Sequence, residues 1–256
     1  MRKILFASSE VHPLIKTGGL ADVSGSLPLA LHKHGQDIRI IIPAYRQCLE
    51  ALEDINCVAT IKLDGVYEPV EILQSTLPNS DVPLWLVHSP QHYDRQGGPY
   101  CKEEGGDWDD NAARFALFSR AIAALALNQA GLNWQPEVLH CNDWQTGLAV
   151  AFVSEYANRP KTVFTIHNLA YQGLYSKDVF DVFVCIVSCK YWLTTRSTIS
   201  LWSWCCIGNF YYFSATFEKE VYGKNERFWW FWFWTWRGRI LRSGSKHWCK
   251  ICMPYL

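Results

Sequence analysis

The segment from residue 3 to residue 42 alternates between strand-like and helix-like patterns, which few folds permit. Residues 3–8 are a short apolar run typical of a buried strand, and residues 37–42 form a second such run that Pro43 ends. Between them, a glycine-containing loop leads into a helical pattern over residues 20–34, which Gly35 closes. Two strands joined by a crossover helix lie parallel in one sheet. The opening therefore predicts a parallel sheet.

The same alternation continues to residue 166. The β-rich stretch 58–87 is predicted to form a hairpin-like insertion that returns to the sheet. The remaining predicted elements alternate again: a helix over residues 109–130, a strand over 137–140, a helix over 144–156 and a strand over 161–166. The fold class is therefore predicted to be α/β, with a doubly wound, Rossmann-like parallel sheet.

The composition changes abruptly after residue 181. The chain has 24 Lys and Arg against 24 Asp and Glu, but residues 1–181 hold 14 and 21 of these, and residues 182–256 hold 10 and 3. The second part also contains nine of the 13 Trp and six of the 10 Cys. No ordinary domain has this composition. We therefore predict an incomplete N-terminal domain at residues 1–181 and an aberrant tail, residues 182–256, that is not folded.

Two functional interpretations of the tail are weak. Cysteines stand at 205, 206, 249 and 252, a spacing that fits a four-ligand zinc site poorly. The aromatic run at residues 228–236 beside arginines is compatible with a membrane-surface anchor, but it lacks amphipathic spacing. Our hypothesis is that the tail is a frameshift product, because Trp and Cys share codons that begin with TG. Resequencing the coding DNA tests it, and an intact single frame in independent isolates would contradict it.

The whole chain gives few signs of a membrane or nucleic-acid partner. No apolar run reaches the ~20 residues needed to span a bilayer. The first 181 residues are acidic, which argues against a nucleic-acid surface. The irregular cysteine spacing and the lack of a secretory signal predict a cytoplasmic protein.

Three polar clusters follow predicted strands, where open α/β sheets bind their ligands. They lie at residues 16–23, 140–144 and 167–173. In the first, Lys16 and the Gly18-Gly19 pair precede a helix, whose free N–H groups and partial positive charge suit a diphosphate. Each cluster also has a purely structural interpretation: a strand-to-helix turn, a helix cap at Asp143, and a core histidine at His167. Their expected convergence on one sheet edge favours a site.

Four sequence motifs resemble a known family. KTGGLADV at 16–23, which SEVHP precedes, YDRQGGPY at 93–100, HCNDWQTGL at 140–148 and VFTIHNLAYQGLYS at 163–176 are similar to signatures of bacterial glycogen synthases and plant starch synthases. Order and spacing match as well, and the resemblance covers essentially residues 1–180.

The resemblance implies the N-terminal domain of a two-domain glycosyltransferase of GT-B type. Such an enzyme transfers glucose from ADP-glucose to the non-reducing end of an α-1,4-glucan such as glycogen, with retention, and needs no metal or other cofactor. Mapped onto this chain, the family's diphosphate contacts are Lys16, Gly18 and Gly19. Asp22 lies near the nucleotide sugar. His167 and Asp143 are the catalytic residues, and Tyr100 and Asn168 bind on the glucose and acceptor side.

The likeness stops at residue 181, apart from a short similar island at residues 214–221. The family's second domain, which carries the adenosine pocket and further diphosphate cations, has no counterpart in the sequence. We therefore expect little or no activity from this truncated chain. The alternatives are an inactive remnant that at most binds nucleotide sugar or glucan, and a relative that prefers UDP-glucose.

Overall fold

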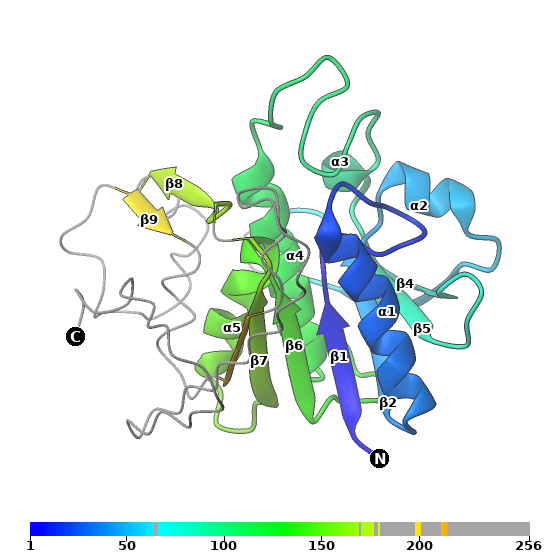
Figure 1. Cartoon of the computed structure of the whole chain (residues 1–256). Helices are drawn as coiled ribbons and strands as arrows, with labels where there is room; N and C mark the ends of the chain where they lie inside the picture. The colour runs from blue at the N-terminus through cyan, green and yellow to red at the C-terminus, as the bar shows by residue number, and fades with distance from the viewer. Residues whose placement is uncertain (64–65, 169, 177–178, 180–197, 201–210, 215–256) are drawn as a thin grey trace, which may run out of the picture.

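The computed structural model describes residues 1–63, 66–168, 170–176, 179, 198–200 and 211–214 (Figure 1). Its strands are β1 (Lys3–Ala7), β2 (Asp37–Pro43), β3 (Asn56–Ile61), β4 (Val70–Thr76), β5 (Pro83–His88), β6 (Val138–Asn142), β7 (Lys161–Ile166), β8 (Leu174–Ser176), β9 (Thr198–Ser200) and β10 (Tyr211–Ser214). Its helices are α1 (Gly19–Lys33), α2 (Arg46–Ala51), α3 (Pro90–Tyr93), α4 (Asn111–Ala126) and α5 (Gly147–Ser154), and a short 3-10 helix, η1 (Trp144–Thr146), precedes α5.

Eight of the described strands form one sheet in the order β10-β7-β6-β1-β2-β5-β4-β3. From β10 to β5 neighbouring strands are parallel, whereas β4 runs antiparallel to both β5 and β3. The predicted parallel unit is confirmed, because β1 pairs with β2 in parallel register from Lys3 opposite Asp37 to Ala7 opposite Ile41. The predicted insertion is confirmed too, since β3 and β4 form an antiparallel ribbon and β5 returns beside β2.

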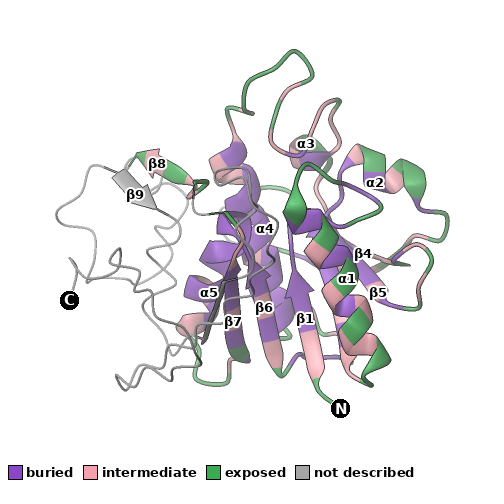
Figure 2. Ribbon diagram, in the orientation of Figure 1, coloured by how far each residue is buried: buried purple, intermediate pink, exposed green. Residues whose placement is uncertain are grey.

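The central strands and α4 are the most buried elements (Figure 2). In β2, residues 40–43 are buried without alternation, because helices and loops cover both faces of a parallel sheet at its centre. The helix α4 carries a broad apolar surface that includes Phe115, Phe118 and Ile122, and it packs against α5. The sheet centre is therefore rigid, and it presents its loops at the carboxyl ends of the strands.

Two predicted helices differ from the observed ones. The predicted helix over residues 144–156 begins as the 3-10 helix η1, and α5 follows only at Gly147. The reason is local: the Thr146 hydroxyl donates to the carbonyl of Asn142 (2.8 Å), a side-chain bond that favours a tight turn over a regular α-helix start. The predicted helix over residues 109–130 is shorter, as α4 ends at Ala126. The helix α2 was not predicted.

The predicted boundary at residue 181 stays a prediction. Beyond it, β9 pairs antiparallel with β8, and β10 lies parallel to β7 at the edge of the main sheet. The cysteines at 205, 206, 249 and 252 and the aromatic run at 228–236 lie outside the described residues. In the described part of the chain, no helix has the length and apolar character required to cross a membrane.

Candidate functional site

The three polar clusters lie at one edge of the sheet. They follow β1, β6 and β7, which are adjacent and parallel, so their carboxyl ends point the same way (Figure 1). Asn142, at the end of β6, ties the ends of these strands together: its amide donates to the carbonyl of Ala7 at the end of β1 (2.9 Å), and its oxygen lies 3.0 Å from Nε2 of His167, which follows β7. The convergence expected from the sequence is therefore observed.

Asp143 lies at the centre of this edge. It has a positive φ of 55°, a conformation that is rare outside glycine and that turns the chain sharply after β6. Its side chain is 7% exposed, and Oδ1 accepts a hydrogen bond from the backbone N–H of His167 (2.7 Å). Burial raises the pKa of the Asp143 carboxyl to about 7, although the N–H groups of His167 and Asn168 favour the ionised form. The carboxyl therefore titrates near neutrality.

His167 is held as a neutral ring. Because the Asn142 amide nitrogen is directed at Ala7, its oxygen accepts from His167, so Nε2 carries the proton. Burial lowers the pKa of His167 to about 4. Burial, and then the nearby His167, lower the pKa of His140 to about 3. At neutral pH the site therefore contains a neutral imidazole whose Nε2–H orientation is fixed by Asn142.

The glycine loop before α1 carries the only predicted cation of the site. Lys16 Nζ lies 2.7 and 2.8 Å from the two carboxylate oxygens of Asp22, and both side chains are about half exposed. Gly18 is the cap of α1 and Gly19 its first residue, and an added Cβ at either position would meet nothing within 4 Å. The loop thus places a half-exposed ammonium group, paired with Asp22, beside the N-terminus of α1, where Gly18 and Gly19 leave space for a phosphate ligand.

The structure also reveals Glu10, which the sequence analysis did not identify as a site residue. Its carboxylate is 3% exposed and accepts from the Thr17 N–H (2.6 Å), the Thr17 hydroxyl (2.7 Å), the Gly18 N–H (3.3 Å) and the Tyr100 hydroxyl (2.6 Å). Its negative charge is among the causes that raise the pKa of Asp143. The signal available in the sequence was a carboxylate in the short segment that follows β1 and leads to the glycine loop.

Tyr100 reaches the site because α4 holds its loop. The buried Arg114 donates to the carbonyls of His92 (2.7 Å) and Pro99 (2.9 Å), and Asn111 donates to the carbonyl of Tyr100 (2.9 Å). Burial, and then the charge of Glu10, raise the pKa of Tyr100, so its hydroxyl stays protonated.

Asn168 differs from the other predicted site residues. Its side-chain oxygen accepts from the Ala170 N–H (2.9 Å), so the amide stabilises the turn that follows β7. Only its backbone N–H, which interacts with Asp143, joins it to the central carboxyl. The structure therefore brings its backbone into the site and uses its side chain locally.

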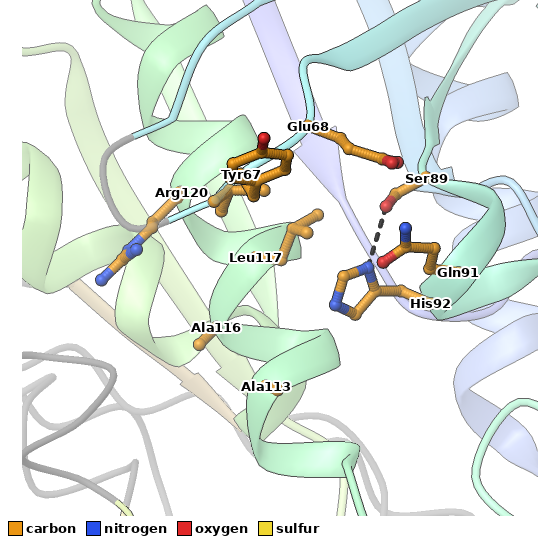
Figure 3. Close-up of a pocket in the computed structure, with 10 residues that line it drawn as sticks. Tyr67, Glu68, Ser89, Gln91, His92, Ala113, Ala116, Leu117 and Arg120 are labelled. Atoms are coloured by element: carbon orange, nitrogen blue, oxygen red, sulfur yellow. Dashed lines mark hydrogen bonds between the residues drawn. The ribbon is translucent and has the colours of Figure 1, made fainter.

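A separate hollow of about 200 Å³ lies between the β3–β4 connection, α3 and α4 (Figure 3). Tyr67, Glu68, Ser89, Gln91 and Arg120 are among its lining residues, and the Ser89 hydroxyl lies 2.8 Å from His92 Nδ1. It contains none of the predicted site residues. Within the described ranges, no group of three or more His, Cys, Asp and Glu side chains is placed to hold a metal ion.

Comparison with known proteins places these features in a family. The family model described as the starch synthase catalytic domain matches residues 3–200. The glycogen synthase of Thioalkalivibrio sulfidiphilus is 57% identical over 180 residues, which are 70% of this chain and 37% of that protein. Glycogen synthase 2 of Nitrosococcus oceani is 54% identical over 181 residues, 71% of this chain and 37% of that protein. The chain thus spans little more than a third of the length of these relatives.

A solved structure agrees at the level of the fold. The catalytic domain of starch synthase IV from Arabidopsis thaliana, bound to ADP and acarbose, superposes with a TM-score of 0.64 at 23% identity. The match covers 84% of this chain and 44% of that one, and it confirms the α/β fold of a GT-B catalytic domain. By the extent of the family match and the identity to its relatives, the chain belongs to the starch synthase catalytic domain family, which includes the bacterial glycogen synthases.

Proposed function

We propose that this protein is part of a glucosyltransferase that transfers glucose from ADP-glucose to the non-reducing end of an α-1,4-glucan with retention. The observation that supports this most is the meeting of Lys16, Asp143 and His167 at the carboxyl ends of three adjacent parallel strands. These residues are far apart in the sequence, and the parallel order of β1, β6 and β7 brings the loops that carry them to one edge of the sheet.

In the proposed reaction, the bond between the anomeric carbon of glucose and the diphosphate oxygen breaks. A bond to the acceptor 4-hydroxyl oxygen forms, and the proton of this hydroxyl passes to the departing diphosphate oxygen as ADP leaves. Lys16 and the N-terminus of α1 offset the negative charge on the leaving diphosphate. Neutral His167, whose ring Asn142 orients, and Asp143 hold the glucosyl unit, while Tyr100 and Asn168 lie on the sugar side. These residue roles are part of the proposal, and it requires no metal or other cofactor.

The test separates binding from turnover. We expect ADP and ADP-glucose to bind the purified 256-residue chain in calorimetry, and Lys16→Ala to weaken both. We expect little incorporation of radiolabelled glucose into glycogen, because this chain corresponds to 37% of the length of its relatives. Absence of any nucleotide binding would contradict the proposed donor site, and robust glucan elongation would contradict the expected lack of turnover.

UDP-glucose is the alternative donor. The site residues described above concern the diphosphate and the sugar and do not discriminate between the two nucleosides. The same titration with UDP compares the two donors directly: tighter binding of UDP than of ADP would favour the alternative. The inactive remnant is the other alternative: such a chain would bind nucleotide sugar or glucan but transfer no glucose.

We also infer a reducing, cytoplasmic setting, since Cys48, Cys57, Cys101 and Cys141 are free thiols.

A further inference from the structure

Glu10 is a buried carboxylate whose hydrogen-bond partners come from two different loops. Thr17 and Gly18 belong to the glycine loop that follows β1, and Tyr100 belongs to the long polar loop before α4. All of these partners are neutral N–H or O–H donors. Two of them lie at the N-terminus of α1, whose partial positive charge stabilises an anion there.

The directions of these hydrogen bonds are determined. A carboxylate can only accept hydrogen bonds, so the Tyr100 hydroxyl donates to Glu10 (2.6 Å). The Ser9 hydroxyl, 2.7 Å from the same oxygen, must then donate to Tyr100. The chain of donors therefore runs from Ser9 through Tyr100 to Glu10 and leaves the second carboxylate oxygen for the two amides of the glycine loop.

We propose that Glu10 is a positioning residue whose carboxylate joins the glycine loop to the loop that carries Tyr100, and so fixes the diphosphate side of the site relative to the sugar side. The inference rests on the proposed function only for its consequence on ligand binding. By holding the Thr17 and Gly18 amides, Glu10 fixes the backbone that leads into the first turn of α1, where the phosphate is proposed to bind.

The test measures whether a substitution in one loop changes the amide exchange rates in the other loop. Hydrogen exchange of the Thr17 and Gly18 amides is followed by NMR in the full chain and in two conservative variants, Glu10→Gln and Tyr100→Phe. Glu10→Gln should speed exchange at both amides by about tenfold or more, because a neutral amide is a weaker acceptor than a carboxylate. Tyr100→Phe removes one hydroxyl that contacts neither amide. It should nevertheless speed their exchange several-fold, because the carboxylate loses its anchor.

Glu137→Gln is the matched control. Glu137 also accepts a backbone N–H, that of Lys3 (3.1 Å), but it lies before β6, at the opposite end of the strands. This variant should speed exchange at Lys3 and leave Thr17 and Gly18 unchanged. Unchanged exchange at both glycine-loop amides in Tyr100→Phe would overturn the proposal, since Glu10 would then act only as a local cap of α1.

Ligand binding supplies a readout that a purely structural role would not move. ADP affinity, measured by calorimetry, should fall about tenfold in Glu10→Gln and stay unchanged in Glu137→Gln. Faster amide exchange with unaltered ADP affinity would overturn the positioning role. If the unaltered chain binds no ADP, the proposed function fails, and the exchange data alone decide whether Glu10 joins the two loops.

Discussion

Replacing the carboxyl of Asp143 by an amide should change how stability depends on pH. Burial raises its pKa from 3.8 to about 7, so the folded protein holds a proton that the unfolded chain has lost. A raised pKa in the folded state contributes stability below about pH 4 that is lost as the pH rises to about 7. The full shift of about 3 pKa units corresponds to about 4 kcal/mol at 1.36 kcal/mol per unit.

Asp143→Asn removes this titration and keeps an oxygen that accepts from the His167 N–H. The parent loses stability as the pH rises and the variant does not. The difference between their free energies of unfolding should therefore shift in favour of the variant by about 2–3 kcal/mol from pH 5 to pH 8, since part of the parent's loss already lies below pH 5. Urea unfolding at several pH values, followed by circular dichroism, measures the difference. A difference that stays constant from pH 5 to pH 8 would refute the reasoning.

Asp110→Asn is the control of opposite sign. Burial alone would raise the pKa of Asp110, but its two hydrogen bonds with Arg95, at 2.8 and 2.6 Å, lower it below the ordinary value. A lowered pKa contributes stability that is lost only as the pH falls into the acid range. The difference between this variant and the parent should therefore be constant between pH 5 and pH 8.

Three further substitutions test the site and its support. Lys16→Ala should weaken ADP binding in calorimetry by about tenfold, whereas Lys33→Ala, an exposed lysine at the end of α1, should not; equal affinities would remove Lys16 from the site. Arg114→Lys should cost about 2–4 kcal/mol in urea unfolding, because buried carbonyls lose a planar donor, and an unchanged midpoint would contradict this. Gly173→Ala places a Cβ 2.5 Å from Trp144 at a φ of +58°, so tryptophan fluorescence and thermal stability should both change; neither changing would contradict the close contact.

The fold was predictable from the sequence where patterns are local. The run of residues 3–8, the helix closed by Gly35 and the strand stopped by Pro43 each carry their own signals, and β1, α1 and β2 follow them closely. The short helix α2 escaped because its six residues are too few to show a helical period. The 3-10 start of the next predicted helix escaped because a single hydroxyl of Thr146 decides it.

The site was predictable as a location and less so as a network. Strand ends identified the clusters around Asp143 and His167, since parallel strands bring their carboxyl ends together. Glu10 was missed because its importance comes from Tyr100, which lies 90 positions further along the chain. The ligand role of Asn168 stays a prediction, and the bond that its side-chain oxygen accepts from the Ala170 N–H depends on turn geometry that the sequence did not indicate.

The position of β1 in the sheet has a consequence for biosynthesis. One neighbour, β2, follows β1 after a single helix. The other neighbour is β6, whose Val138 pairs with Ile4 of β1. At about 5–20 residues per second, a ribosome needs about 7 to 27 seconds to make the intervening chain. During that time one edge of β1 lacks its partner, and such an edge is open to pairing with another chain. The order of the strands therefore leaves one edge of β1 unpaired in the nascent chain until β6 has been made, and Glu10 and the glycine loop follow that strand.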